Sequence, residues 1–292
     1  MITNANGEVI GVTAVQGGNT IRVKAKKAVL LATGGCSRNK EMLKRFLSPL
    51  KVHGVPLLYS YGSAWQKGDG ITMAQAVGAK TTKLFCYGMD IGLVTDEEKN
   101  TGTYPLKAGT GCALVSGDAK RHMTEYNGLW PQEFYTMELW DQKNGLAWAI
   151  MDASGVESKL RDVDSALANA LLFKGDTYRE LAEAIGLDPD VFEQTMDEYN
   201  AEKETPMNQA PFYAAKVVPT APDTVGGIGI NTNMEVINAF DEVIPRLYAA
   251  GTTAGGWRGQ INAGCGMAVS WAVTSGRIAG QNMSKLDSCC EL

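Results

Sequence analysis

The feature that most constrains this chain is a glycine-rich stretch that leads directly into a helical pattern. The stretch, AAGTTAGGWRGQINAGCGMAVSWAVTSGRIAG, occupies residues 249–280, and its second half spaces apolar residues as a helix does. Glycine loses more backbone freedom on folding than any other residue. So much glycine ahead of a helix requires either a tight packing contact or a bound ligand that approaches the bare backbone.

Length and composition exclude several classes of protein. The 292 residues suffice for one large domain or two ordinary ones, and the net charge of −5 gives no reason to expect nucleic-acid binding. The six cysteines form no CxxC pair and there are only two histidines, so we expect no structural metal site. No apolar run approaches the roughly 18 residues that a membrane span needs. We expect a cytoplasmic protein.

Strand patterns dominate the two ends of the chain. Apolar and polar residues alternate in EVIGVTAV and TIRVKAKKAVLLATGG, which lie on either side of Gly17 and Gly18. This pattern predicts a hairpin. The apolar run AVLLATGG, residues 28–35, predicts a buried strand that ends on two glycines beside a ligand crevice. FYAAKVVP, VGGIGINTNMEVIN and IPRLYAAG predict further strands after residue 207.

Helical patterns lie between these strands. NKEMLKRF predicts a short helix, and GDGITMAQAVGA predicts another, with Asp69 as the N-cap and Gly78 at its end. DTYRELAEAIGL opens with a Thr177 capping box, and DPDVFEQTMDEYNAEKE opens with Asp188 as N-cap and Pro189 at the first helical position. The simplest account is a β-rich frame interrupted by an α-richer insert.

Taken together, these segments resemble the flavoprotein family of fumarate reductases, succinate dehydrogenases and 3-ketosteroid dehydrogenases. The resemblance rests on KAVLLATGG, GDGITMAQAVGA, DTYRELAEAIGLDPDVFEQTMDEYNA, PFYAAKVVPTAPDTVGGIGINTNMEVIN and IPRLYAAGTTAGGWRG…GRIAG, which follow the family's order. It implies an α/β fold, in which a partial Rossmann-like FAD-binding domain carries an inserted α+β capping domain. The implied domains are residues 1–84 and 208–292 for FAD and residues 85–207 for the cap and substrate.

One part of the family pattern has no match. The strand–GxGxxG–helix unit that holds the ADP half of FAD is not found, because GDGITM and GTGCAL follow no suitable strand. We therefore expect the C-terminal part of such a flavoprotein, which alone binds FAD weakly or not at all. Two alternatives stay open: a second chain supplies the ADP-binding half, or the protein is non-catalytic and binds a small molecule or partner without FAD.

The resemblance assigns flavin contacts to the glycine-rich stretch. Backbone amides of Met267, Ala268 and Val269 at the helix N-terminus stabilise negative charge on the reduced flavin. Gly251 lies in the loop ahead of them, and Thr252 stands where the family usually has a glutamate that holds the ribityl chain. The alternative interpretation is a glycine-loosened loop that docks a buried helix.

The resemblance also assigns contacts to the ADP moiety of FAD. Ala32, Thr33, Gly34 and Gly35 would lie against it. Asp69 matches a family position that contacts the cofactor, and it serves equally as a plain helix N-cap. These two roles of Asp69 are compatible.

Substrate recognition departs from the fumarate reductases at four positions that handle carboxylates. Where that subgroup has two histidines, this chain has Asp223 and Tyr87 at or near the matching positions. Where the subgroup has two arginines, this chain has Leu129 and residue 261 or 262. A dicarboxylate needs cationic partners with fixed geometry. We therefore expect an enone, a ring compound or a monoacid as substrate, with hydride transfer between FAD and an activated C=C or CH–CH bond.

The candidate catalytic residues are Arg258, Tyr87, Tyr126 and Asp223. Arg258 is the cation left within the glycine-rich motif, and it either binds an anionic or carbonyl substrate or pairs with a surface carboxylate. Tyr87 and Tyr126 can donate a proton to a carbonyl, or they are half-buried packing residues. Three tryptophans of the insert are expected either in the cap core or along an aromatic pocket: Trp130, Trp140 and Trp148.

Overall fold

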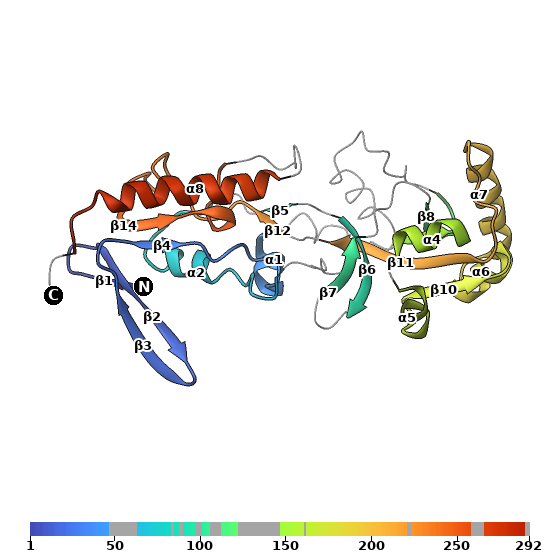
Figure 1. Cartoon of the computed structure of the whole chain (residues 1–292), viewed down its shortest axis with the longest axis horizontal. Coiled ribbons are helices and arrows are strands. Elements are labelled where there is room, and N and C mark those ends of the chain that lie inside the picture. Colours follow the sequence, from blue (N-terminus) through green and yellow to red (C-terminus); the bar gives the residue numbers. More distant parts are fainter. Residues whose placement is uncertain are drawn as a thin grey trace. The chain divides into compact units, whose positions relative to one another are not determined.

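The computed structural model describes residues 1–46, 63–82, 85–87, 90–96, 101–105, 112–121, 147–160, 162–220, 223–257 and 266–289. The chain divides into two compact units (Figure 1). Unit 1 comprises Met1–Leu47, Gly62–Tyr87 and Asp223–Leu292, and unit 2 comprises Ser48–Tyr61 and Gly88–Pro222. Among the described residues, no helix is long and apolar enough to cross a membrane. The same residues hold no group of three or more candidate metal ligands.

Unit 1 begins with a three-stranded antiparallel sheet. Its order is β1-β2-β3, formed by β1 (Ile2–Thr3), β2 (Val9–Gln16) and β3 (Asn19–Lys24). Gly17 and Gly18 have φ values of 56° and 82°, so both turn positions are left-handed, as a tight two-residue hairpin requires. The predicted hairpin is confirmed.

The second sheet of unit 1 joins segments from the two ends of the chain. Its order is β13-β14-β4, formed by β13 (Glu235–Ile237), β14 (Val243–Ala249) and β4 (Val29–Leu31). β14 and β4 run parallel, with Leu247 opposite Val29 and Ala249 opposite Leu31. The expectation that these two segments share one sheet is confirmed.

Helices cover both faces of this second sheet (Figure 1). Leu247 of β14 packs in one cluster with Ile71 of α2 (Asp69–Gln75). The next residue, Tyr248, packs in another cluster with Ala279 of α8 (Met267–Ser284). Successive side chains of a strand point to opposite faces, so α2 and α8 lie on opposite sides of β14.

β4 is less buried than its apolar sequence predicts. Leu31 is buried, but Leu30 is 36% exposed. β4 lies at the edge of its sheet, and α8 packs over Tyr248, which stands opposite Leu30 on the neighbouring strand. The prediction of a buried strand is therefore confirmed for Leu31 and wrong for Leu30.

Two short helices of unit 1 form near their predicted places. α1 (Lys40–Phe46) follows Asn39, whose Oδ1 accepts a bond from Met42 N at 3.0 Å. For α2 the predicted N-cap is wrong by one residue, because the N-cap is Gly68 and Asp69 stands in the first turn with no side-chain cap bond. An acidic side chain there still complements the helix dipole.

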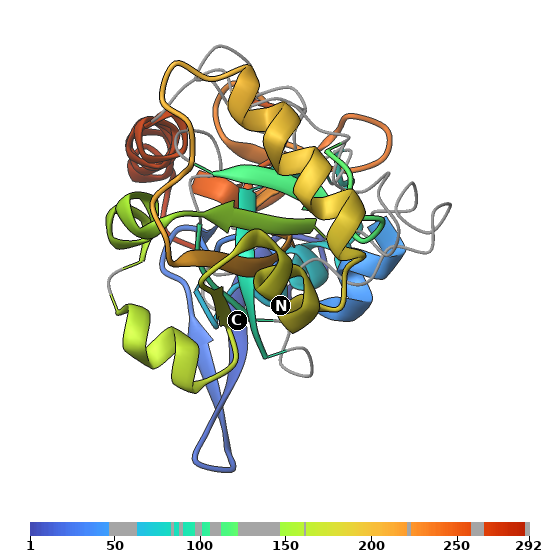
Figure 2. The same ribbon diagram turned by 90° about the vertical axis from the view of Figure 1, so that its right-hand side faces the viewer.

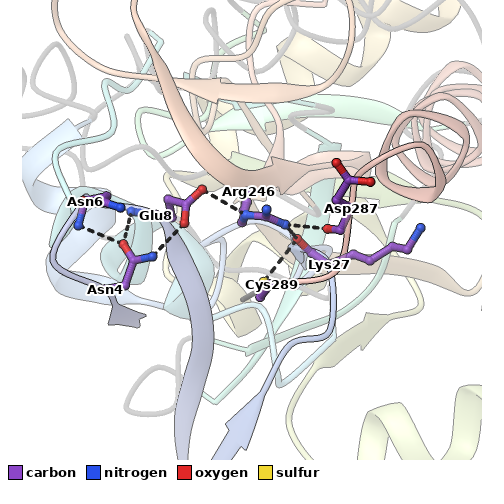
Figure 3. A network of polar contacts seen from close by, with 7 residues as sticks. All are labelled: Asn4, Asn6, Glu8, Lys27, Arg246, Asp287 and Cys289. Atoms are coloured by element: carbon purple, nitrogen blue, oxygen red, sulfur yellow. Dashed lines mark hydrogen bonds and ion pairs between the residues drawn. The ribbon is translucent and has the colours of Figure 1, made fainter. Parts of the chain in front are cut away.

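The end of the chain is bound to the start of unit 1 through Arg246 (Figure 3). Its Nε donates to Glu8 Oε1 at 3.1 Å, and its Nη1 donates to the carbonyls of Lys27 at 2.8 Å and Asp287 at 2.9 Å. Cys289 N donates to Lys26 O at 2.6 Å. One guanidinium therefore joins β2, the segment before β4, β14 and the tail after α8.

Unit 2 is built on one antiparallel sheet with β11 at its centre. β11 pairs with β9 along one edge and with β10 and β6 along the other. The sheet order is β7-β6-β11-β9-β8, with β10 beside it. The strands are β6 (Asp90–Asp96), β7 (Thr101–Pro105), β8 (Ala113–Ser116), β9 (Ala147–Met151), β10 (Leu172–Gly175) and β11 (Phe212–Thr220).

Two pairs of helices cover this sheet (Figure 2). Ile150 of β9 packs in one cluster with Phe192, on the side of α6 (Tyr178–Ile185) and α7 (Pro189–Ala201). Ala149 packs in the other cluster with Val156 and Ala166, on the side of α4 (Ala153–Lys159) and α5 (Val163–Ala168). β9 is thus covered by helices on both of its faces.

The caps of α6 and α7 form as predicted. Thr177 Oγ1 accepts from Glu180 N at 3.1 Å, while Glu180 Oε2 reaches back to Asp176 N at 2.9 Å. Asp188 Oδ1 accepts from Asp190 N at 3.0 Å, and Pro189 is the first helical residue. Local sequence was sufficient here because a cap needs only neighbouring residues.

β11 lies in unit 2, although the sequence analysis assigns it to the final segment, residues 208–292. Its hydrogen-bonded partners are strands of unit 2, and the chain passes from unit 2 to unit 1 after Pro222. Unit 1 also contains a two-stranded sheet, which is formed by β5 (Phe85–Tyr87) and β12 (Asp223–Val225). We keep the inserted capping domain as a proposal, with unit 2 as its body.

Candidate functional site

Three loops of unit 1 are joined by hydrogen bonds beyond the carboxyl ends of β4 and β14. Thr253, which lies in the short helix η3 (Gly251–Thr253) after β14, is fully buried. Its hydroxyl donates to Gly34 O at 3.1 Å in the loop after β4. Its carbonyl accepts from Ile228 N at 2.8 Å in the segment after β12. Ligands of open parallel α/β sheets bind outside the carboxyl ends of the strands, so this is the expected edge for a cofactor.

The N-terminus of α2 lies against the same loop. Gly70 N donates to Thr33 Oγ1 at 3.2 Å, and this oxygen lies 3.5 Å from Thr253 Oγ1. Asp69, the neighbour of Gly70, is exposed, as are Ala32 and Thr33. The residues assigned to the ADP moiety are therefore brought together, with exposed side chains beside them.

Part of the glycine excess is required by packing. A Cβ on Gly255 would lie 2.5 Å from Gly227 N, and a Cβ on Gly227 would overlap the carbonyl oxygen of Thr253. Real Cβ atoms essentially never approach other atoms that closely. The Thr224–Gly227 turn and the loop after β14 therefore meet backbone to backbone.

The N-terminus of α8 offers open amides. Gly266, at φ 84°, is the N-cap and has no side chain to bind them, and its Cβ position has nothing within 4 Å. The first intrahelical bond joins Ser270 N to Gly266 O at 2.9 Å. Helix geometry leaves the preceding three amides, of Met267, Ala268 and Val269, without intrahelical acceptors. Such a terminus favours an anion or a polar acceptor.

Two candidate catalytic residues meet in the β5–β12 ladder. Tyr87 and Asp223 are direct partners in its antiparallel register, and Cys86 pairs with Thr224 beside them. Thr224 Oγ1 accepts from Cys36 N at 3.1 Å, which binds this ladder to the loop after β4. The backbone register therefore places Tyr87 and Asp223 opposite each other in a ladder that is bonded to one of the three loops.

Comparison with known families identifies the fold. The family described as "FAD binding domain" matches residues 1–269. The chain belongs to this FAD-binding family. FAD is therefore its cofactor, and the expected resemblance is confirmed.

Relatives of this FAD-binding chain are named as reductases and dehydrogenases. A probable fumarate reductase, Ifc3 of Shewanella frigidimarina, is 30% identical over 98% of this chain and 49% of its own length. A digoxin reductase of Eggerthella lenta is 28% identical over 98% of this chain and 58% of its own length. The chain thus spans about half the length of the curated relatives it matches.

Solved structures confirm the α/β fold class. The open conformation of a flavocytochrome c3 fumarate reductase superposes with a TM-score of 0.76 at 29% identity, over 97% of this chain and 50% of that one. A 3-ketosteroid Δ1-dehydrogenase from Sterolibacterium denitrificans reaches a TM-score of 0.77 at 20% identity, over 95% of this chain and 56% of that one. The second likeness supports the fold alone.

The donor set of unit 1 fits FAD. The open amides of α8 suit the electron-rich edge of a flavin, and the half-buried Thr252 offers a hydroxyl one residue after Gly251. Thr33 and Ala32 remain exposed on the loop assigned to the ADP moiety.

Several predicted residues lie outside the described part of the chain. Arg258 and Tyr126 are among them, together with Leu129, Trp130 and Trp140. Trp148 is described, and it packs edge-to-face on Phe173 with ring centroids 5.5 Å apart. Its place against the α6–α7 core favours the packing interpretation for this tryptophan.

Unit 2 contains a polar cavity of about 590 Å³ between α7 and the turn after β8. Arg121 lines it, donates to Glu202 Oε2 at 2.6 Å, and lies 5.1 Å from the Tyr199 ring centroid. The bond from Arg121 lowers the pKa of Glu202 below its usual value. None of the predicted site residues lines this cavity.

Sequence reasoning missed two residues that hold the candidate site together. Trp271 and Ser275 of α8 both bind Gly251, at 3.0 Å and 2.9 Å. The available signal was their spacing of one helical turn, which places them on one face of α8. That spacing does not reveal the partner, because Gly251 comes from a different element.

Proposed function

We propose that the protein forms the flavin-facing part of an FAD-dependent oxidoreductase that acts on an activated C=C or CH–CH bond. When bound, FAD supplies the hydride exchange between its N5 and a substrate carbon. The observation that carries the proposal is the meeting of the loops after β4 and β14 with the open amides of α8. Hydrogen bonds among these loops position groups that suit a flavin, and the described residues contain no group of three or more candidate metal ligands.

The roles of individual residues follow from their places. Amides of Met267, Ala268 and Val269 stabilise negative charge, because they form the positive end of an 18-residue helix. Gly251 and Thr252 hold the middle of the cofactor. Ala32, Thr33, Gly34, Gly35 and Asp69 contact the ADP moiety.

Tyr87 and Asp223 are proposed to serve the proton that accompanies hydride transfer. Their backbone pairing in the β5–β12 register supports this role, and a phenol and a carboxylate are both groups that can transfer a proton. Tyr126 and Arg258 are proposed to bind a substrate carbonyl or anionic group, on the strength of the sequence.

The substrate class is proposed to be an enone, a ring compound or a monoacid. Relatives include a urocanate reductase and a digoxin reductase, so fumarate is not the common substrate of these proteins. In this chain, tyrosine and aspartate occupy places where fumarate reductases carry histidines. Burying a carboxylate without a cationic partner costs roughly several kcal/mol.

A partner segment with the ADP-binding half is proposed to cover one flank of α8. Val269 and Val273 are 70% and 68% exposed there, and Leu30 on the neighbouring edge strand is 36% exposed. Parallel sheets are normally covered on both faces, so this apolar flank fits a further strand and helix. The flank consists of Val269, Ala272, Val273, Gly276 and Gly280.

The first experiment is a flavin absorbance spectrum of the purified protein with FAD, alone and with a polypeptide that carries a strand–GxGxxG–helix unit. We expect weak or no flavin retention alone and stoichiometric retention in the complex. Val273→Lys should block this gain, whereas Arg277→Lys on the neighbouring exposed face should not. No retention in either sample would favour the second candidate function, a non-catalytic binding protein.

The second experiment tests the substrate class in the flavin-loaded protein. Reduced flavin should be reoxidised by an α,β-unsaturated ketone or monoacid and not by fumarate. Arg258→Ala should weaken the substrate while leaving flavin content intact. Fumarate turnover equal to that of a true fumarate reductase would contradict the substrate proposal, and loss of flavin in Arg258→Ala would assign that residue to the cofactor.

A further inference from the structure

Two side chains of α8 hold both polar groups of one glycine. Trp271 Nε1 donates to Gly251 O at 3.0 Å, and Gly251 N donates to Ser275 Oγ at 2.9 Å. The Ser275 hydroxyl in turn donates to Trp271 O at 2.6 Å. Ser275 is fully buried, so its hydroxyl uses both its donor and its acceptor capacity in one closed arrangement.

The indole of Trp271 is itself held in place. It packs against the hydrophobic clusters on both sides of β14. Trp257 stacks on it with ring centroids 5.2 Å apart and planes at 12°. Gly251 and Trp257 both belong to the described part of the loop that follows β14, residues 250–257. Both residues therefore rest on the same side chain.

We infer that Trp271 and Ser275 are positioning residues that fix the distance between Thr252 and the first-turn amides of α8. Thr252 directly follows the clamped Gly251, and the amides of Met267 to Val269 precede Trp271 on the same rigid helix. Fixing Gly251 to this helix thus fixes the two groups of flavin contacts relative to each other. This inference rests on the proposed function.

The physical effect is preorganisation. Backbone dipoles stabilise a developing charge most when they need no rearrangement, and a site held too loosely loses this advantage. The reduced flavin carries more negative charge than the oxidised one beside the α8 amides. Loosening the clamp should therefore weaken binding of the reduced flavin more than binding of the oxidised flavin.

The test compares two clamp variants with two matched controls in the flavin-loaded protein. Trp271→Phe keeps an aromatic ring and removes the N–H donor, and Ser275→Ala removes the hydroxyl. Trp65→Phe changes a tryptophan that is 81% exposed, and Thr274→Ala removes an exposed hydroxyl from the same helix. Ser275→Cys replaces Ser275→Ala if the alanine variant does not fold.

Each clamp variant should lower the affinity for reduced flavin relative to oxidised flavin about tenfold, which is about 30 mV in midpoint potential for a two-electron couple. The controls should leave the potential unchanged. A clamp variant that lowers the melting temperature but keeps the wild-type potential would overturn the positioning role and leave the proposed function intact. A wild-type protein that retains no flavin even in complex with the polypeptide that carries the strand–GxGxxG–helix unit would overturn the proposed function, and the positioning role with it.

Discussion

The helical core of unit 2 and the loops of unit 1 are held together by different kinds of contact. In unit 2, helices α6 and α7 are capped by side chains at the surface, and their core contains large apolar residues such as Phe192, Met196 and Leu181. In unit 1, the loops beyond β4 and β14 are joined by the buried hydroxyls of Thr253 and Ser275 and by closely packed glycines.

The difference shows where each unit is sensitive to substitution. A conventional core responds to lost volume, because its stability comes from apolar burial. Loops that present backbone amides respond to a lost hydroxyl or an added methyl group, because these change the geometry of the backbone. We therefore expect changes in unit 2 to affect stability, and changes in the unit 1 loops to affect flavin binding as well.

The largest effect on stability is expected in the unit 2 core. Phe192 is fully buried, so Phe192→Ala should lower the free energy of unfolding by roughly 3–5 kcal/mol. Phe240, which is 83% exposed, provides the control, since Phe240→Ala should change it by less than about 0.5 kcal/mol. Denaturant unfolding measures both. Equal effects of the two changes would contradict the described core.

The next effect should appear where loops of unit 1 touch. Gly255→Ala places a methyl group against the backbone of Gly227, and overpacking of this kind costs roughly 1–3 kcal/mol. Flavin retention should fall in the same variant. Gly117, whose Cβ position has nothing within 4 Å, is the matched control. Unchanged flavin retention in Gly255→Ala would contradict the expectation that changes in the unit 1 loops affect flavin binding.

A smaller effect is expected from one buried hydroxyl. Thr224 is 4% exposed and its Oγ1 accepts from Cys36 N, so Thr224→Val removes that acceptor and costs roughly 1–3 kcal/mol. Thr13→Val on the exposed part of β2 should change stability by less than about 0.5 kcal/mol. Thermal unfolding with and without flavin distinguishes them. A neutral Thr224→Val would show that this bond does not hold β12.

The smallest effect concerns the acid stability of unit 1. The hydrogen bond from Asn4 and then the bond from Arg246 lower the pKa of Glu8 (Figure 3). A lowered folded-state pKa adds stability above the unfolded-state pKa, and this stability is lost as the pH falls through the folded-state value. Glu8→Gln should therefore flatten the acid side of the stability profile, while Glu157→Gln should not. A profile unchanged by Glu8→Gln would contradict this pairing.

Local features could be predicted directly from the sequence, whereas the tertiary feature predicted correctly, the shared sheet of β4 and β14, came from the resemblance to a known family. The Gly17–Gly18 hairpin and the caps at Thr177 and Asp188 depend on neighbouring residues, which a sequence displays directly. The exposure of Leu30 and the place of β11 in unit 2 depend on which strands pair, and strand pairing joins distant segments.

The candidate site shows the same division. The resemblance pointed to Thr33, Gly251 and the α8 amides, and hydrogen bonds bring these segments together in unit 1. It did not reveal that Trp271 and Ser275 hold Gly251, because one helical face carries no signal for its partner. The roles of Arg258 and Tyr126 stay predictions.

The central claim is tested most directly by amide hydrogen exchange of the protein, measured once without FAD and once at a saturating concentration of FAD. We predict that bound FAD slows exchange at residues 267–269, 251–252 and 33–35 of unit 1, because their amides or neighbouring groups contact the cofactor. Exchange in α6 and α7 of unit 2 should remain unchanged. Bound FAD that leaves residues 267–269 unprotected, or that protects unit 2 alone, would contradict the account.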